Sequence, residues 1–334
     1  MANKYEQDLD KNAANYVPLS PLTFLRRSAA VYPDHQAVVH GNVSYTYSKA
    51  YDRARRLASQ LASKGIRKND TVAVLATNVP AIYDAHYGVP MAGGVLNTIN
   101  TRLDAATIAF ILDHGESKAV ITDTELSPVM KEALSLCQSK PIVIDVDDTA
   151  GPGGERLGEM EYEDFIAGGD PEFDWRLPED EWDAISLNYT SGTTGRAKGV
   201  MVEHHSLANA YSAWEEAYEL SQADTHLQMA SFSFDVFTGD FARGLCSGAK
   251  LVLCPRDILM SADKLFELIQ VEGVNCAEFV PVVLRGLLSF LRKEGKRLDQ
   301  MRLLICGSDS WFMDEYNDCR MYLGQNTRLI NSFG

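Results

Sequence analysis

Short apolar runs rich in Val, Ile and Leu alternate with longer segments of helical period along most of this 334-residue chain. Such alternation is typical of βαβ units, because two parallel strands need a long crossover connection between them. The clearest unit begins with a strand at residues 43–46 and continues with a helix that Gly65 should end in a left-handed conformation. One face of that helix carries the apolar residues Ala50, Ala54, Leu57, Ala58 and Leu61. The pattern predicts an α/β fold with mainly parallel sheets.

The same periodicity predicts the remaining elements. Further strands are expected in the segments TVAVLAT, GVLNTI, KAVIT, PIVID, AISLNYT, KLVLC, RLLICG and TRLIN. Helices between them are expected to start near Val79, Asp104, Glu125, His205, Ala262, Val282 and Trp311. Asp104 is a suitable N-cap for one of these helices, and Gly115 is a suitable end for it.

A change in composition divides the chain. Residues 145–184 are acidic and rich in Gly and Pro, and they contain at most a short helix around MEYEDFI. A chain of 334 residues, of which 46% are apolar, is long enough for about two domains. We therefore predict two subdomains, residues 1–182 with an acidic connector at 145–183, and residues 183–334.

Charge and hydropathy argue against several classes of partner. The formal net charge is -15 and no block of basic residues is present, which argues against nucleic acid. The first twenty residues do not have the pattern of a secretory signal, and no apolar run approaches the roughly 20 residues that cross a bilayer. These features predict a cytoplasmic protein without a membrane span. The six cysteines form no CxxC pair and lie mostly inside apolar runs, which favours reduced, buried thiols.

The segment YTSGTTGRAKG, residues 189–199, combines glycines, hydroxyls and cations directly after a predicted strand. Glycines permit positive φ, and successive exposed N–H groups in such a turn form an anion-binding concavity. The segment does not match the Walker P-loop, G-x-x-x-x-G-K-[ST]. Counting from Gly192, that motif needs Gly at position 197 and Ser or Thr after the Lys, where this chain has Ala197 and Gly199. Clusters of Ser, Thr and Gly also mark ordinary surface turns, and this reading stays open on composition alone.

The longer motif YTSGTTGRAKGV resembles the phosphate-binding signature of the AMP-forming adenylating superfamily. This superfamily contains acyl-CoA synthetases, luciferases and the adenylation domains of nonribosomal peptide synthetases. Ala197 departs from the usual Pro before the Lys, which should loosen the turn without removing a ligand group. Residues from about 20 to 195, including NVPAIYDAHYGVPMAGGVLNTINTRL, are most similar to medium-chain or aryl acyl-CoA synthetases. Residues from about 196 onward, including GVMVEHHSLANAY, FSFDVFTGDF and NSFG, are more similar to peptide-synthetase adenylation domains.

The resemblance implies an AMP-forming acid–thiol ligase that uses ATP and Mg²⁺. A carboxylate attacks the α-phosphate of ATP, and a thiol of CoA or of carrier-protein phosphopantetheine then displaces AMP. Catalysis of this kind depends on positioning and on charge stabilisation around the phosphates. The phosphate ligands that the resemblance implies, with Thr190 and Lys198 as the catalytic pair, are Thr190, Ser191, Gly192, Thr193, Thr194, Gly195 and Lys198. The implied adenine contacts are Gly307, Ser308, Asn331, Phe333 and Gly334, although Phe333 could equally be a core residue.

The acid-binding residues follow from the same resemblance. Asp235 in FSFDVF matches the carboxylate that holds the α-amino group of an amino acid, which slightly favours amino-acid adenylation. The expected side-chain pocket consists of Val236, Gly239, Glu278, Leu304, Cys306 and Ser332. An acid at Glu278 would favour a basic substrate such as ornithine or lysine, unless Glu278 is a surface residue. Synthesis of a medium-chain or aryl acyl-CoA is the alternative activity, and a catalytically inactive nucleotide-binding module is the alternative of another class.

The resemblance assigns no metal ligand within the chain. The family continues beyond the position of Gly334 with a Glu that binds Mg²⁺, an Asp that binds the ribose, and a small C-terminal domain with a catalytic Lys. We therefore expect most of the large N-terminal domain without the C-terminal domain. The adjacent His204 and His205 point about 100° apart if they are helical, so they are a poor metal pair.

Overall fold

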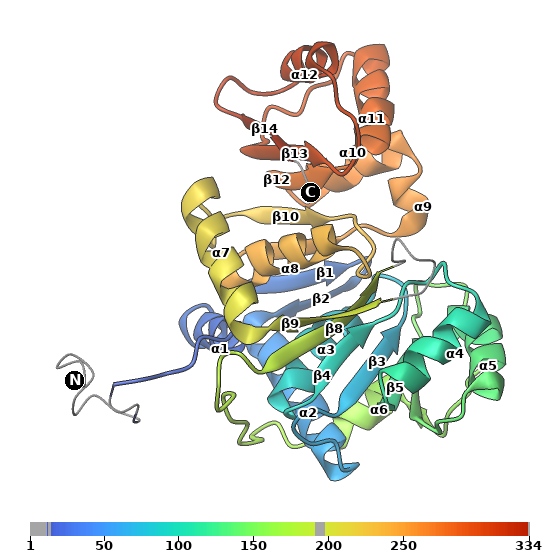
Figure 1. The fold of residues 1–334 in the computed structure, drawn as a ribbon. Coiled ribbons are helices and arrows are strands. Elements are labelled where there is room, and N and C mark those ends of the chain that lie inside the picture. The colour runs from blue at the N-terminus through green and yellow to red at the C-terminus, as the bar shows by residue number, and fades with distance from the viewer. Residues whose placement is uncertain (1–11, 13–14, 191–197, 333–334) are drawn as a thin grey trace, which may run out of the picture.

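The computed structural model describes residue 12 and residues 15–190 and 198–332, with the backbone alone for Asp235 (Figure 1). The helices are α1 (Leu22–Val31), α2 (Tyr47–Ser63), α3 (Pro80–Met91), α4 (Ala105–His114), α5 (Ser127–Leu136), α6 (Tyr162–Ala167), α7 (His204–Tyr218), α8 (Asp235–Ser247), α9 (Arg256–Leu259), α10 (Ala262–Val271), α11 (Pro281–Glu294) and α12 (Met313–Arg320), with a short 3₁₀ helix η1 (Thr124–Leu126). The α/β fold predicted from the sequence is confirmed.

The described strands form two seven-stranded sheets that are mainly parallel. The first sheet, in spatial order, consists of β7 (Met160–Glu161), β6 (Ile142–Val146), β5 (Ser117–Asp123), β3 (Thr71–Leu75), β4 (Val95–Thr98), β8 (Ala184–Thr190) and β9 (Lys198–Glu203). The second consists of β14 (Arg328–Ser332), β13 (Leu303–Gly307), β12 (Cys276–Phe279), β10 (Thr225–Gln228), β11 (Lys250–Leu253), β1 (Gln36–His40) and β2 (Val43–Thr46). Antiparallel pairing occurs at one edge of each sheet, between β8 and β9 and between β1 and β2.

The two sheets do not divide the chain at residues 182 and 183. Strands β8 and β9, from the second half of the sequence, complete the first sheet through the parallel pairing of β4 with β8. Strands β1 and β2, from the N-terminal part, complete the second sheet, because β1 pairs with β11 at Val38 and Leu251. The acidic connector contributes β7 and α6 at the far edge of the first sheet. The sheet division therefore differs from the subdomain boundary predicted from composition.

The termini of several predicted elements have the expected local chemistry. Asp104 caps α4, because its carboxylate accepts a hydrogen bond from the Thr107 N–H at 2.8 Å, and Gly115 follows the last turn. Gly65 has φ +88° just beyond α2, as predicted. Strands β1, β9, β10 and β12 and helices α1 and α8 were not among the predicted elements.

Helices α2, α3 and α8 lie between the sheets, and their packing creates the largest buried cluster. That cluster contains Leu57 of α2, Ile82 of α3 and Phe241 of α8, together with strand residues from both sheets. Tyr83 of α3 reaches the second sheet, where its hydroxyl donates to Gln228 Oε1 at 3.0 Å. Helices α10, α11 and α12 cover the end of the second sheet that carries β12–β14 (Figure 1). In the described part of the chain, no helix has the combined length and apolar character needed to cross a membrane.

Candidate functional site

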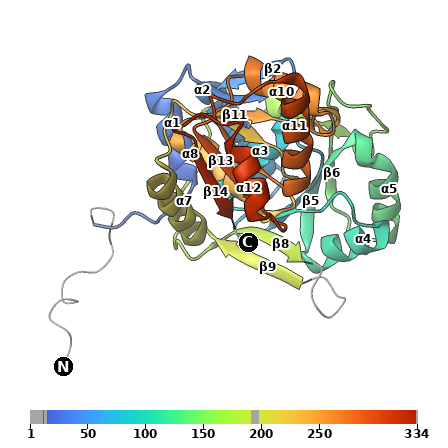
Figure 2. The same ribbon diagram turned by 90° about the horizontal axis from the view of Figure 1, so that it is seen from above.

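A cavity of about 1610 Å³ opens between the two sheets and gathers residues from distant parts of the sequence. The predicted site residues that line it are Thr190, Val236, Gly239, Glu278, Ser308 and Ser332. Parallel strands place their carboxyl ends at one edge of a sheet, and ligands of α/β folds bind beside that edge. Thr190, Ser308 and Ser332 each stand at or just after the carboxyl end of a strand, namely β8, β13 and β14. Figure 2 shows the β8–β9 hairpin on the same side of the molecule as the end of β14.

The predicted phosphate loop joins the two strands of the β8–β9 hairpin. Thr190 and Lys198 are directly paired across the antiparallel ladder, so they hold the two ends of the loop together. Both are exposed, and Thr190 lines the cavity. The predicted ligands Ser191, Gly192, Thr193, Thr194 and Gly195 lie outside the described residues. The hairpin thus fixes the position of Thr190, after which the loop begins, and of Lys198, at which it ends.

The predicted adenine contacts lie at the ends of two paired strands. Gly307 pairs with Ser332 in the parallel β13–β14 ladder, and a Cβ at Gly307 would stand 2.7 Å from the carbonyl oxygen of Ser332. Ser308 follows with φ +68°, a conformation that non-glycine residues adopt rarely and that tends to occur at functional sites. Asn331 is exposed but does not line the cavity, and Phe333 and Gly334 lie outside the described residues.

Two of the predicted pocket residues lie elsewhere. Leu304 and Cys306 are fully buried in an apolar cluster with Leu284 and Leu287 of α11, and they are absent from the described lining of the cavity. Alternate residues of a strand face opposite sides of its sheet, so these two side chains share the α11 side. Burial raises the pKa of Cys306 to about 12, which keeps its thiol protonated. All six cysteines are free and buried, as predicted.

Glu278 lines the cavity but is already paired with a cation of the chain itself. Arg243 of α8 places its Nη2 2.5 Å from Glu278 Oε2 and 2.9 Å from Asp240 Oδ1. The prediction that Glu278 offers a free carboxylate to a basic substrate therefore needs correction. Sequence reasoning missed Arg243, because nothing local in FTGDFARGL marks it as a partner of a residue on β12. Asp235 occupies the first position of α8, and its side chain is not described.

Two histidines at the cavity also escaped the sequence analysis. The Nδ1–H of His86 donates to the carbonyl oxygen of Ile82 at 2.7 Å, and burial lowers the pKa of His86 to about 4. Its ring is therefore neutral near pH 7, with Nδ1 committed to the helix backbone. His114 Nδ1 shares a hydrogen bond of 2.7 Å with the hydroxyl of Tyr189, the residue before Thr190. This bond ties the last turn of α4 to the strand that leads into the phosphate loop.

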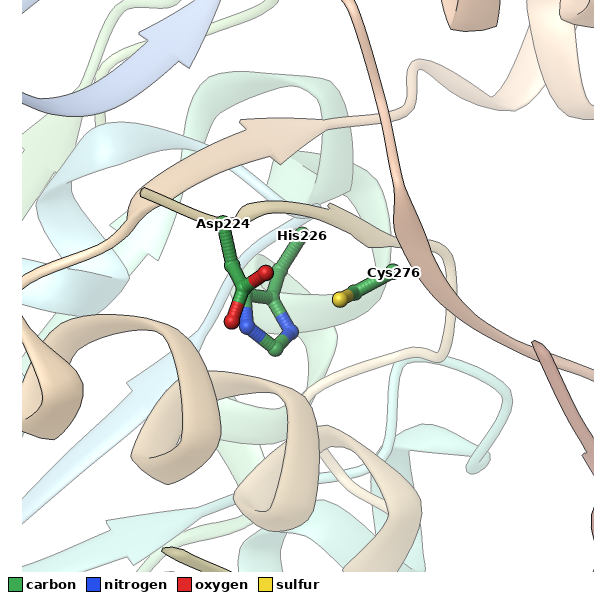
Figure 3. A group of neighbouring side chains, drawn as sticks. All are labelled: Asp224, His226 and Cys276. Carbon is green, nitrogen blue, oxygen red and sulfur yellow. The ribbon is translucent and has the colours of Figure 1, made fainter. Parts of the chain in front are cut away.

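A group with metal-ligand chemistry lies in the second sheet (Figure 3). The ligand atoms of Asp224, His226 and Cys276 lie within 4.8 Å of one another, and all three side chains are buried. Arg302 already occupies this place, since it donates to both carboxylate oxygens of Asp224 at 2.8 and 2.7 Å and to Cys276 Sγ at 3.5 Å. A guanidinium bound to two members of the group disfavours a second cation. We therefore interpret the group as an internal ion pair.

The adjacent His204 and His205 contact different parts of the chain. His204 is buried and hydrogen-bonded to Ser20 Oγ at 2.8 Å, while the ring of His205 stacks on Trp182 at 5.3 Å. Neither belongs to the described lining of the cavity.

Comparison with known proteins adds to this geometry. A family model described as AMP-binding enzyme matches residues 25–334. Acetate–CoA ligase CCL3 of Humulus lupulus is 47% identical over 216 residues, which are 61% of this chain and 38% of that protein. Butyrate–CoA ligase AAE11, peroxisomal, of Arabidopsis thaliana is 37% identical over 300 residues, which are 86% of this chain and 50% of that protein. The chain thus spans half the length, or less, of these curated relatives.

Solved structures share the fold. The anthranilate CoA ligase AuaEII in complex with anthranoyl-AMP superposes with a TM-score of 0.85 at 19% identity, covering 97% of this chain and 61% of that one. The inhibitor-bound N-terminal domain of FACL13 from Mycobacterium tuberculosis has a TM-score of 0.80 at 26% identity, covering 95% of this chain and 76% of that one. The match of the family model over almost the whole chain, together with this fold, shows that the protein belongs to the AMP-binding enzyme family.

Proposed function

We propose that the chain carries the nucleotide- and acid-binding domain of an AMP-forming carboxylic acid–CoA ligase. The observation that carries the proposal is the single cavity that joins Thr190 of the phosphate hairpin to Ser308 and Ser332 at the strand ends and to Val236, Gly239 and Glu278 of the acid-binding region. In this arrangement one ligand end lies near the exposed hairpin and the other in a cavity with apolar and aromatic walls. Activation of an acid by ATP requires such joint positioning of two anions.

The roles proposed for the chain's own residues follow from their places. Lys198 offers a full charge at the return strand of the hairpin, and Thr190 offers a hydroxyl opposite it, so the pair would hold the ATP phosphates. The end of β13 is constrained, with Gly307 against Ser332 and Ser308 in the left-handed region, and the adenine is proposed to lie beside these strand ends. ATP is the ligand proposed for this region. The reaction that ATP supplies is transfer of its adenylyl group to the acid, which produces an acyl adenylate for a thiol to attack.

Magnesium is part of the proposal only as the usual partner of ATP. Among the described lining residues, Glu278 is the single carboxylate, and it is bound to Arg243. These residues therefore do not form a magnesium site, and we derive no step through the ion.

The acid is proposed to have an uncharged tail, and the thiol is proposed to be that of CoA. The curated relatives at 36–47% identity are named as ligases of CoA with acetate, butyrate, 2-methylpropanoate, benzoate or trans-cinnamate. The similarity to the peptide synthetase FmoA3, at 23% identity, supports the fold alone. Acyl-CoA synthesis, the alternative in the sequence analysis, is therefore better supported than amino-acid adenylation. Two of these relatives are named peroxisomal ligases of butyrate, so the cytoplasmic assignment receives no support from them.

Isothermal titration of the 334-residue chain with Mg²⁺-ATP tests the nucleotide part of the proposal. Wild type should bind, and Lys198→Ala should bind at least about tenfold more weakly, because one charge-assisted phosphate contact is lost. Lys293→Ala removes a similarly exposed cation on α11, outside the described cavity lining, and should leave binding unchanged. Absence of binding by wild type, or equal binding by Lys198→Ala, would contradict the proposal.

A further inference from the structure

The guanidinium group of Arg243 is buried among two carboxyl groups and two aromatic rings. Its side chain is only 5% exposed, and its two carboxylate partners, Asp240 and Glu278, are 3% and 9% exposed. The guanidinium carbon also lies 5.4 Å from the ring centre of Trp214 and 6.0 Å from that of Tyr218. Two carboxylates and two aromatic faces are the groups that recognise an alkylguanidinium or alkylammonium ligand.

The backbone of α8 is adapted to the same group. A Cβ added at Gly239 would stand 3.1 Å from Arg243 Nη2, so the absence of a side chain gives the guanidinium its room. Burial raises the pKa of Asp240 to about 7, although Arg243 opposes the shift, and one oxygen of Asp240 has no hydrogen-bond partner among the described residues. The guanidinium of Arg243 is therefore held between the carboxyl groups of Asp240 and Glu278.

This cation subsite belongs to the wall of the proposed acid-binding cavity. Arg243, Glu278 and Gly239 all line the cavity, beside Trp214 and Tyr218. An acid whose tail ends in an amine or a guanidine would suit Glu278, but it would meet a position already filled by a charge of the same sign.

We propose that Arg243 is a specificity-determining residue, which fills the cation subsite of the acid-binding cavity from within the chain and thereby excludes acids with a cationic tail. The inference rests on the proposed function, because it assigns this cavity to the acid. Specificity of this kind comes from a repulsive element rather than from a new attractive contact. Because the charges of this wall are already paired with one another, the wall suits an uncharged acyl or aryl tail.

The first experiment detects the subsite without nucleotide or turnover. Arg243→Ala should leave an anionic hole, so ethylguanidinium at millimolar concentration should raise the thermal unfolding midpoint of this variant by about 3 °C or more. Ethylurea, which has a similar shape but no charge, should have a much smaller effect. Wild type, whose subsite is full, should not respond selectively to ethylguanidinium. Arg243→Ala/Glu278→Gln, whose subsite has lost the Glu278 carboxylate, should respond much less than Arg243→Ala.

The variant can be informative even if it does not fold alone. In that case ethylguanidinium, but not ethylurea, should restore the circular dichroism spectrum of wild type. Equal responses to the two compounds, or no response of a folded or an unfolded Arg243→Ala chain, would overturn the proposal.

The second experiment compares two acids with the same five-carbon chain in ATP–pyrophosphate exchange. Wild type should prefer pentanoate over 5-aminopentanoate, and Arg243→Ala should shift the ratio of the two rates at least about tenfold toward the amino acid. An unchanged ratio in an active variant would overturn the inference. If no variant exchanges pyrophosphate with any acid while ethylguanidinium still stabilises Arg243→Ala, then the proposed function fails for this chain and the cation subsite remains.

Discussion

At the residue scale, charges buried in this fold are matched by partners from distant parts of the sequence. Arg53 of α2 lies 2.8 Å from Asp84 of α3 and 2.7 Å from Glu163 of α6, and the side chains of Arg53 and Asp84 are 10% and 2% exposed. Tyr162 donates a further hydrogen bond of 3.0 Å to Asp84. Burial raises the pKa of Asp84, while Arg53 opposes this shift, so the ionised form depends on the pair.

Replacing Arg53 alone should lower the free energy of unfolding more than replacing Arg53 and Asp84 together. Arg53→Met leaves Asp84 buried without its cation and should lower the free energy of unfolding by about 3–5 kcal/mol. The double variant Arg53→Met/Asp84→Asn removes both charges and should recover a large part of that loss. Urea unfolding followed by circular dichroism measures both values, and equal losses in the single and double variants would refute the coupling.

His204 gives the stability of the protein a predictable dependence on pH. Burial lowers the pKa of His204 to about 4, with a smaller opposing effect from Asp183. The unfolded chain, with a histidine pKa near 6.5, therefore takes up the proton first as the pH falls. The contribution of His204 is complete above about pH 6.5 and is lost between about 6.5 and 4, at up to about 1.4 kcal/mol per pH unit.

The substitution His204→Asn isolates this contribution, since the amide can keep the hydrogen bond to Ser20 and does not titrate. The free energy of unfolding should fall less steeply in the variant than in wild type between pH 6.5 and 4.5. Because the other titrating groups are shared, the difference between the two curves reports His204 alone. Parallel curves would contradict the assignment.

At the element scale, the contact between α2 and α3 depends on one glycine. A Cβ at Gly88 of α3 would stand 2.8 Å from a methyl carbon of Leu57 and 2.9 Å from the carbonyl oxygen of Ala54, both on α2. These distances are shorter than any normal contact of a Cβ, so the two backbones approach each other only because Gly88 has no side chain. The contact positions α3, and with it Tyr83 and His86, beneath the second sheet.

Gly88→Ala should therefore destabilise the protein by about 1–3 kcal/mol, although Ala is the better helix former. Gly286 of α11 is the matched control, because a Cβ there would meet no atom within 4 Å. Gly286→Ala should be neutral or stabilising by up to about 1 kcal/mol. Equal effects of the two substitutions in denaturant unfolding would show that helix propensity, and not the close approach, decides the result.

At the scale of the whole molecule, each sheet is completed by strands from the other half of the chain. Residues 183–203 supply β8 and β9 to the first sheet, and residues 36–46 supply β1 and β2 to the second. A break between Trp182 and Asp183 would leave two fragments with unpaired strand edges, which favour aggregation. The exchange also brings the phosphate hairpin of one sheet opposite the strand ends of the other, and the cavity lies between them.

Fragments 1–182 and 183–334 are therefore expected not to fold separately, but to form a soluble complex when they are produced together. A chain with a protease site at this position, purified intact and then cleaved, serves as the control and should keep its circular dichroism spectrum. Size-exclusion chromatography and thermal unfolding measure the outcome. Cooperative unfolding of either fragment by itself would show that the sheets are independent.

Much of the fold was accessible from the sequence because the relevant signals are local. The apolar face of α2, the Asp104 cap of α4 and the chain reversal at Gly65 each depend on a few neighbouring residues. Strands β10 and β12 escaped prediction because their sequences, THLQ and CAEF, lack the runs of Val, Ile and Leu that marked the predicted strands. The phosphate segment was identified by its Gly, Ser and Thr content, and its two ends are the paired residues Thr190 and Lys198.

The sequence by itself determined the α/β class, most helices and the family. The hydrophobic period, the helix caps and the phosphate-binding motif each depend on residues that are close together in the sequence. Only the tertiary structure decided which strands share a sheet, as when β1 pairs with the distant β11. It alone also decided that Leu304 faces the core and that Glu278 is neutralised by Arg243. Which strands pair and which charges pair depend on packing between segments that are distant in the sequence, so no local sequence pattern predicts them.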